Sequence, residues 1–404
     1  MNSVDPLWRW LVDGPGDDVV IVDARRTWLR RELVDRAARA QLALGRGRGR
    51  RVPVPVPVEG EGVARLLGVI AAGALPCVGG KLDLVAAPCW TPDGTSLAVA
   101  TSGSTGAPRW AALSPAGVEY VTERIVATLG LQPGERLFCP VPLRHTYGLS
   151  QLWACLRARA TLVMPRLPLL GLDWQGARGA EVVAAIPAQV DALLAAGLRP
   201  RAITLAGQST PVSARRRMDA ALPGVEKHVF YGLTEATTRV LALPPGEFMS
   251  RPEATGRALP GTALRICDGE LWVRGPQVFL GYLDRPGSAP SEWLATGDIF
   301  AEHQGLYRLV GRRDSMLKRF GEKVFPEQVE NAISALPGVR DVHVVSEGEI
   351  LVARVVGEAS DAEIRRKVRH QLGGVAVPDR VERLVRLART AAGKLPRGPQ
   401  VAVG

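Results

Sequence analysis

Cysteine and histidine are both scarce in this chain of 404 residues, with five of each. The cysteines are scattered along the chain, and no two of them form a Cys-x-x-Cys pair. A structural zinc site or a disulfide framework needs thiols or imidazoles that cluster at characteristic spacings. The composition therefore argues against both kinds of site, and it is typical of a protein that works in a reducing cytoplasm.

Long apolar runs are also missing. A membrane-spanning helix needs about 18 or more consecutive apolar residues, and no stretch of the chain offers them. The first ten residues, MNSVDPLWRW, do not combine a basic start with an apolar segment, as a secretory signal does. We therefore expect no membrane span and a cytoplasmic location.

Basic residues outnumber acidic ones, 51 against 40, which gives a net charge of +11. Such a charge favours anionic partners, such as nucleotides, coenzyme A, an acidic carrier protein or nucleic acid. Much of the excess is arginine in an Ala-, Val- and Gly-rich chain, so we discount it as a functional signal. The run RGRGRR (46–51) is short and lacks aromatic neighbours. It predicts a solvated loop rather than a nucleic-acid-binding arm.

Helical and strand signals alternate along the chain, which indicates an α/β fold of two or three domains. The alternating prolines of VPVPVPV (52–58) exclude a central strand and predict an edge strand or an extended connector. A helix is predicted over 115–129, capped by Ser114 and ended by Gly130. From about residue 241 short strands punctuated by Gly and Pro follow, and then a compact tail of helices and strands. We place a domain boundary near residues 310–312.

Three strand-like segments each end in a polar loop, namely SLAVATSGSTG, ITLAGQ and HVFYGLTEA. In an alternating α/β chain such loops predict a crevice at the carboxyl ends of parallel strands. The first loop, TSGSTGAPRW (101–110), contains six Gly, Ser or Thr residues. By itself it could be a surface turn. It could also wrap phosphates, because unhindered backbone N–H groups and hydroxyls can converge on an anion beside Arg109. It is not a Walker loop, since no Gly-Lys-Ser/Thr follows at the required spacing.

Five motifs in a fixed order make the sequence specific. They are TSGSTGAPR at 101, YGLTEA at 231, TGD at 296, GRRDSMLKRFGEKVFPEQVE at 311 and RTAAGKLPR at 389. With these motifs the chain resembles the adenylate-forming (AMP-binding) superfamily, which includes acyl- and aryl-CoA ligases, peptide-synthetase adenylation domains and luciferases. The resemblance extends from about residue 60 to the end, and the chain looks like a short variant.

The resemblance implies both a fold and a reaction. Residues 1–310 would form a large α/β domain of layered sheets with a small β-barrel-like part, which binds ATP and the acid. Residues 311–404 would form a small, mobile α+β domain. The enzyme would activate a carboxylic acid with ATP and Mg²⁺, release pyrophosphate, and transfer the acyl group from the acyl-adenylate to a thiol.

The resemblance also assigns the nucleotide site, which must neutralise the charge that gathers on the phosphates. The loop over the phosphates comprises Thr101, Ser102, Gly103, Ser104, Thr105, Gly106 and Arg109. The residues expected along the nucleotide are Ala206, Gly207, Gln208, Tyr231, Gly232, Asp298, Arg312 and Lys323. Among them, Tyr231 would stack near the adenine, Asp298 would accept hydrogen bonds from the ribose hydroxyls, and Arg312 would support the ribose and phosphates.

The catalytic residues follow from the same motifs. Lys394 would be the adenylation lysine, Thr234 would contact a phosphate, and Glu235 would help to hold Mg²⁺. Asp314 falls at the hinge about which the C-terminal domain swings after adenylation. Gly321 suits the approach of a pantetheine arm, although it could equally be an ordinary turn glycine.

Each of these residues also has a simpler explanation when it is taken alone. Glu235 could be a charge at a helix N-terminus, Asp298 a turn residue, and Lys394 a solvated side chain. Two departures from the family pattern bear on activity. The phosphate loop usually ends Pro-Lys-Gly, whereas this chain has Pro-Arg109-Trp110, and Lys323 stands where many members have Arg. Because of these departures, the alternative to an active ligase is a degenerate paralogue that binds a nucleotide without catalysing the reaction.

The segment PVPLRHTYGLSQ offers a clue to the acid. His145 occupies the place where a His borders the acyl pocket in family members that act on non-amino acids, although it could be a packed core histidine. No Asp lies between residues 141 and 153 to bind a substrate ammonium, so an α-amino acid is disfavoured. The identity of the acid stays open. We expect the acyl acceptor to be coenzyme A and the enzyme to act in specialised metabolism. The alternative acceptors are the phosphopantetheine arm of a carrier protein and an amine or other nitrogen nucleophile. A compact ligase of menaquinone synthesis is another candidate.

Overall fold

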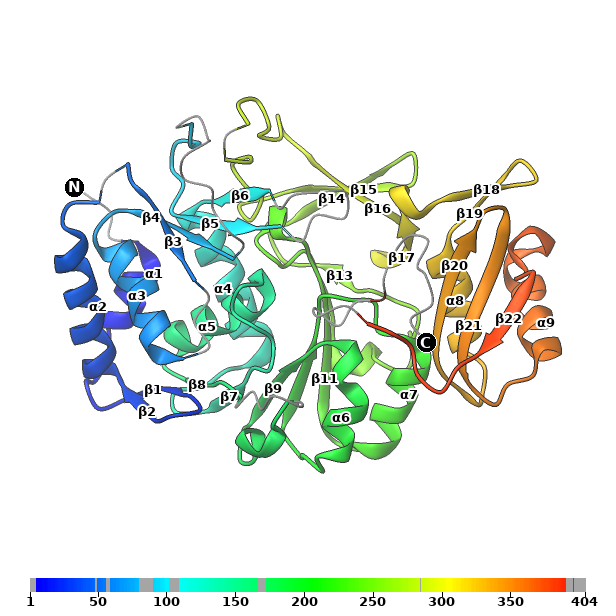
Figure 1. Ribbon diagram of the computed structural model, residues 1–404, viewed down its shortest axis with the longest axis horizontal. Helices are drawn as coiled ribbons and strands as arrows, with labels where there is room; N and C mark the ends of the chain where they lie inside the picture. Colours follow the sequence, from blue (N-terminus) through cyan, green and yellow to red (C-terminus); the bar gives the residue numbers. More distant parts are fainter. Residues whose placement is uncertain are drawn as a thin grey trace.

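The computed structural model describes residues 5–47, 49–55, 59–79, 90–101, 109–165, 172–283, 285–389 and 395. Figure 1 shows a larger body, drawn in blue to yellow, and a smaller C-terminal body in orange at one end of it. In the described part of the chain, no helix is long and apolar enough to cross a membrane.

Within the described residues, the largest sheet has nine strands in the order β13-β12-β11-β10-β9-β7-β8-β1-β2. The strands are β1 (Val19–Val22), β2 (Thr27–Leu29), β7 (Arg136–Phe138), β8 (Thr161–Val163), β9 (Val182–Ala185), β10 (Ala202–Leu205), β11 (Glu226–Tyr231), β12 (Leu241–Leu243) and β13 (Arg257–Ala258). The strands from β11 to β1 run parallel, and β2, β12 and β13 pair antiparallel at the two ends. The parallel strands β9 and β10 are buried on both faces, so their sequences, VVAA and AITL, are mostly apolar rather than alternating.

A smaller sheet carries the Gly-rich loop. Its order is β3-β4-β5-β6, with β3 (Arg51–Val54), β4 (Leu75–Val78), β5 (Leu97–Ala100) and β6 (Trp110–Leu113). The proline-containing β3 lies at the edge, as the VPVPVPV pattern predicts. The three polar loops predicted to border one crevice come from two sheets, because β5 belongs to this sheet whereas β10 and β11 belong to the large one.

The Gly/Pro-punctuated region forms an antiparallel sheet. Its order is β14-β15-β16-β17, with β14 (Ala263–Cys267), β15 (Glu270–Arg274), β16 (Leu294–His303) and β17 (Leu306–Arg312). It is an open sheet in the place where the family resemblance implied a barrel-like part. Its register sets Asp298 directly opposite Arg312.

Helices cover the sheets of the larger body. They are α1 (Pro6–Val12), α2 (Arg30–Leu44), α3 (Gly60–Ala71), α4 (Pro115–Leu129), α5 (Thr146–Ala158), α6 (Val190–Ala195) and α7 (Val212–Ala221). The short 3₁₀ segments are η1 (Trp174–Ala177), η2 (Pro187–Gln189), η3 (Thr234–Ala236) and η4 (Pro245–Glu247), with η5 (Arg313–Ser315) and η6 (Gly374–Ala376) further on. Helix α4 confirms the sequence prediction, since Ser114 accepts a hydrogen bond from Gly117 N and Gly130 ends the helix with φ +55°.

The C-terminal body has its own apolar core. It contains a hairpin of β18 (Leu317–Arg319) and β19 (Glu322–Val324), the strands β20 (Val339–Glu347), β21 (Ile350–Gly357) and β22 (Arg380–Arg383), and the helices α8 (Pro326–Ser334) and α9 (Asp361–Leu372). The predicted helices and strands of the tail are confirmed. The domain boundary at 310/311 stays a prediction; β17 continues to Arg312.

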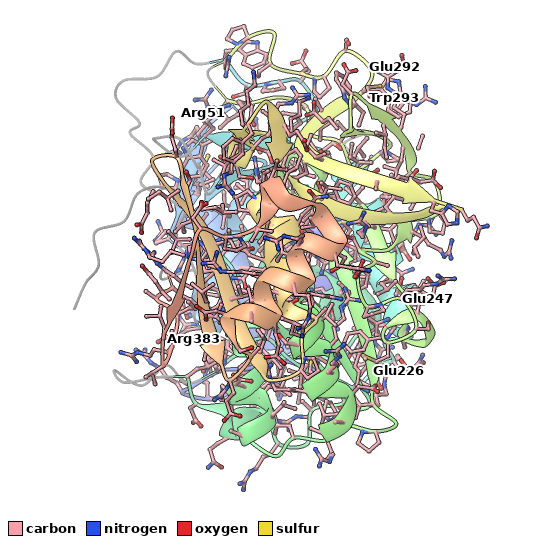
Figure 2. The ribbon with its side chains drawn as sticks, turned by 90° about the vertical axis from the view of Figure 1, so that its right-hand side faces the viewer. Arg51, Glu226, Glu247, Glu292, Trp293 and Arg383 are labelled. Carbon is pink, nitrogen blue, oxygen red and sulfur yellow. The ribbon has the colours of Figure 1, made fainter. Side chains whose placement is uncertain are left out.

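Arginines join the two bodies. Arg217 and Arg340 both pair with Asp191 at 3.1 Å, and Arg216 donates to the carbonyl oxygen of Ala335 at 2.6 Å. These contacts seat β20 and the end of α8 on α7. Figure 2 views the molecule from the end where the C-terminal body lies, so that this body is in front, with Arg383 of β22 near one edge.

Candidate active site

The base of the Gly-rich loop is closed by two hydrogen bonds. The backbone N–H of Thr101 donates to the carbonyl oxygen of Arg109 at 2.7 Å, and Arg109 N donates to Thr101 Oγ1 at 3.3 Å. Strands β5 and β6 then pair from Ala100 and Trp110 onward. Ser102, Gly103, Ser104, Thr105 and Gly106 lie outside the described residues. The loop is thus a connection between antiparallel strands whose two ends are held together.

Tyr282 connects this loop base to Glu235. Its segment lies beside β6, because Leu283 N donates to the carbonyl oxygen of Trp110 and Ala112 N donates to that of Gly281. The hydroxyl of Tyr282 donates to Glu235 Oε1 at 2.8 Å, and the guanidinium carbon of Arg109 lies 5.3 Å from the centre of its ring. Burial, reinforced by the charge of Glu235, raises the pKa of Tyr282 above its usual value, so the phenol stays a donor. Tyr282 could not be identified from the sequence, since no motif or spacing pointed to it.

Thr234 and Glu235 form the short turn η3 directly after β11. Thr234 Oγ1 lies 3.4 Å from Thr146 Oγ1 at the start of α5. His145 is the residue that precedes this helix, and it is half-buried. Gly148 allows the first turn of the helix to lie close to the preceding chain, because a Cβ there would come within 2.6 Å of two carbonyl oxygens. The HTYG segment and the TEA turn therefore lie in contact.

The chain after this turn is held in an unusual conformation. Thr237 and Thr238 have φ values of +46° and +78°, the left-handed region that non-glycine residues seldom adopt. Thr237 Oγ1 donates to the carbonyl oxygen of Gln277 at 2.7 Å. Gly232 is required here, because a Cβ on it would lie 2.0 Å from the carbonyl oxygen of Thr238. Such strain is common at functional sites.

Asp298 lies between a phenol and a guanidinium. It is only 8% exposed, it accepts a hydrogen bond from Tyr231 Oη at 2.6 Å, and Arg312 Nε is 3.5 Å from its Oδ1. Burial and the charge of Asp298 together raise the pKa of Tyr231 well above its usual value. Burial alone would lower the pKa of Arg312, but Asp298 and Asp314 outweigh it and raise that pKa. The structure thus brings Tyr231, Asp298, Arg312 and the predicted hinge residue Asp314 together.

The AGQ segment lies at the same sheet edge. Ala206, Gly207 and Gln208 follow β10, the parallel neighbour of β11. Gly207 has φ +82°, and Gln208 Nε2 is buried without a hydrogen-bond partner among the described residues. An amide with an unused donor next to the end of β11 suits a site for a polar ring.

The predicted residues of the C-terminal body lie apart from this cluster. Gly321 has φ +86° at the tip of the β18–β19 hairpin, beside Phe320. Lys323 is exposed on β19, opposite Lys318 of β18, and its side chain pairs with no acidic side chain among the described residues. Lys394 lies outside the described residues.

Comparisons with known proteins agree with this geometry. Residues 81–283 match the AMP-binding enzyme family, and residues 328–394 match the AMP-binding enzyme C-terminal domain. A 2-succinylbenzoate–CoA ligase of Listeria monocytogenes is 24% identical over 327 residues, which cover 74% of this chain and 68% of that protein. An indoleacetate–CoA ligase of Aromatoleum aromaticum is 29% identical over 329 residues, covering 73% of this chain and 64% of that protein. The chain thus spans about two thirds of the length of these relatives.

The fold is similar to that of o-succinylbenzoate CoA synthetase from Bacillus subtilis in complex with the acyl-adenylate intermediate OSB-AMP. The TM-score is 0.79 at 20% identity, and the match covers 98% of this chain and 97% of that one. The family match extends over half of the chain and includes the Gly-rich loop, the TEA turn and Tyr282. The chain therefore belongs to the AMP-binding enzyme family, as an adenylate-forming acid ligase.

Proposed function

We propose that this enzyme activates a small carboxylic acid as its acyl-adenylate and then transfers the acyl group to coenzyme A. The observation that carries the proposal is the convergence of Arg109, Tyr282 and Glu235 at one side of the end of β11, with Tyr231, Asp298 and Arg312 at the other. One group offers a cation and a carboxylate to the phosphates and their metal ion. The other offers a buried carboxylate to ribose hydroxyls.

The carboxylate of Glu235 fits a Mg²⁺ ion that arrives with ATP. Among the described residues no three His, Cys, Asp or Glu side chains gather as a metal cage. Mg²⁺ is commonly held by one or two carboxylates together with substrate phosphates, so a single oriented Glu is suitable. When bound, the ion would neutralise charge on the phosphates. Tyr282 would fix the direction of the Glu235 carboxylate.

The remaining roles complete the proposal. Residues 102–106 and Arg109 would enclose the phosphates, Lys394 would reach the acyl oxygen and the nucleotide, and His145 would border the acid. Rotation at Asp314 would replace Lys394 by the hairpin around Gly321 before thioester formation. Coenzyme A is the preferred acceptor because the relatives described above are named as CoA ligases.

The test is acid-dependent release of pyrophosphate with Mg-ATP, over a panel of aryl, aliphatic, dicarboxylic and amino acids, with and without coenzyme A. Product masses identify the adenylate and the thioester. Lys394→Ala is expected to abolish pyrophosphate release, whereas Lys367→Ala, on α9, serves as the matched control and is expected to retain it. Adenylate without thioester would point to a carrier protein or an amine as acceptor. ATP binding without pyrophosphate release for any acid would overturn the proposal.

A further inference from the structure

Arg239 is a fully buried cation to which the proposed reaction gives no role. It is 0% exposed, and it follows the strained Thr237–Thr238 turn. Its Nη1 donates to the carbonyl oxygen and the hydroxyl of Thr238, both at 3.0 Å. Its Nε and Nη2 atoms are buried and have no hydrogen-bond partner among the described residues.

Nothing on the described part of the chain balances the charge of Arg239. No carboxylate there lies within ion-pair distance of it. The titratable groups that act on it are the phenol of Tyr147 and the thiol of Cys139. Burial raises the pKa of Cys139 to about 12 and that of Tyr147 further above its usual value, so both are neutral near pH 7. Burial lowers the pKa of Arg239 to about 10, which still leaves the guanidinium charged.

A second buried arginine shows how this fold satisfies a guanidinium when the role is structural. Arg215 on α7 is 3% exposed. Its Nε, Nη1 and Nη2 each reach a backbone carbonyl oxygen, those of Thr210 at 3.3 Å, Phe248 at 3.4 Å and Ala254 at 2.8 Å. Arg239 lacks such a set. A buried donor left without a partner is costly, so an acceptor from outside the described chain would stabilise the two on this cation.

The position of Arg239 indicates which site would supply that acceptor. Its guanidinium carbon lies 4.8 Å from the ring centre of Tyr147 and 4.7 Å from that of Phe230. Tyr147 directly follows Thr146, which contacts Thr234, and Phe230 directly precedes Tyr231. Arg239 is therefore held between the first turn of α5 and the end of β11, the two elements that border the proposed acid site.

We infer that Arg239 is the specificity-determining cation of the acid pocket, and that the substrate is a dicarboxylic acid whose remote carboxylate pairs with the two unused donors. The inference rests on the proposed function, since it concerns the acid that this reaction activates. The planar fork of Nε and Nη2 suits a carboxylate that accepts two parallel hydrogen bonds. Because the guanidinium is shielded from water, an acid with an apolar end at this position would leave both donors unpaired.

The test uses matched acids that differ only at the remote end, which carries a carboxylate, a carboxamide or a methyl group, over a range of lengths and with aliphatic and aromatic spacers. The wild-type enzyme is expected to prefer the best dicarboxylic acid to its methyl counterpart by at least about 100-fold in kcat/KM for pyrophosphate release, as expected of a site built to hydrogen-bond the missing group. In Arg239→Met this ratio is expected to fall to near one. Arg239→Lys retains the charge without the fork, so an intermediate ratio is expected.

Arg215→Met is the matched control, because it removes an equally buried guanidinium away from the acid site. It is expected to lower stability but to leave the ratio between the matched acids intact. Calorimetric binding of the same acids, in the presence of a non-hydrolysable ATP analogue, provides a readout that needs no turnover. It also shows whether each variant is folded, since the analogue binds separately from the acid.

The outcomes separate the two proposals. Activation of methyl-ended acids as well as dicarboxylic ones by the wild-type enzyme would overturn the assignment of Arg239 and leave the ligase function intact. So would a dicarboxylate preference that survives in a folded Arg239→Met variant. Failure of every acid to release pyrophosphate would instead overturn the ligase function, and the assignment with it.

Discussion

Replacing Tyr282 by Phe tests whether the hydrogen bond to Glu235 orients the carboxylate for catalysis. The substitution removes one hydroxyl that donates to Glu235 Oε1 at 2.8 Å and leaves the ring against Arg109 in place. A hydrogen bond to a charged group contributes about 1.5–3 kcal/mol. Because Glu235 is only half-buried, we take the lower part of this range.

A loss of about 1.5 kcal/mol of transition-state stabilisation corresponds to roughly a tenfold lower rate. We therefore expect Tyr282→Phe to lower acid-dependent pyrophosphate release about tenfold, and to raise the Mg²⁺ concentration needed for half-maximal rate. The assay is a Mg²⁺ titration at fixed ATP and acid. If the variant kept its rate within twofold at every Mg²⁺ concentration, the Tyr282–Glu235 contact would have no part in the reaction.

Tyr120→Phe is the matched control for this substitution. Tyr120 lies on α4, and its hydroxyl donates to the carbonyl oxygen of Pro260, also at 2.8 Å, away from Glu235. We expect Tyr120→Phe to lower the free energy of unfolding about as much as Tyr282→Phe does, but to leave the Mg²⁺ dependence of the rate unchanged. An equal catalytic defect in both variants would mean that the rate reports general stability rather than the orientation of Glu235.

Two further predictions concern backbone fit and charge. Gly232→Ala would put a Cβ 2.0 Å from the carbonyl oxygen of Thr238. We therefore expect the TEA turn to be displaced and pyrophosphate release to fall about 100-fold. The pyrophosphate assay measures this loss, and a separate measurement of ATP affinity shows whether binding is also weakened. Glu135 makes two hydrogen bonds to Arg201, at 2.6 and 2.7 Å, which hold its pKa below the usual 4.5. The stabilisation is thus complete above about pH 4.5 and is lost as the pH falls through the lower folded-state pKa. Urea unfolding should show Glu135→Gln less stable than wild type by about 1 kcal/mol near pH 7, and the difference should shrink as the pH falls below 4.5; an unchanged difference would contradict this reasoning.

Local signals account for the parts of the fold that the sequence predicted well. Helix α4 is bounded by Ser114 and Gly130, whose effects act within one helical turn. The proline pattern excluded a central strand at β3, leaving an edge strand or an extended connector, for an equally local reason. By contrast, the sheet to which β5 belongs depends on pairing with β4 and β6, and no local pattern encodes the difference between this sheet and the one that contains β10.

The candidate site divides in the same way. Residues inside continuous motifs, such as Glu235 and Asp298, could be identified from the sequence. Their partners could not, because Tyr282 lies 47 positions from Glu235 and Thr146 lies 88 positions from Thr234. Arg239 lies three residues after the YGLTEA motif, yet its role depends on the absence of a nearby acceptor among the described residues, which only a packed structure reveals.

Arg109 and Trp110 depart from the family pattern, and the structure shows that both contact the segment that contains Tyr282. An ammonium at position 109 would act as a point charge, whereas a guanidinium is planar and stacks on aromatic rings. Here it lies over Tyr282, whose segment is held beside β6 by the carbonyl oxygen of Trp110. The same Tyr282 binds Glu235. The substituted loop exit is therefore connected through one ring to the proposed metal-binding carboxylate, so a shift of the loop over the phosphates would also reorient Glu235.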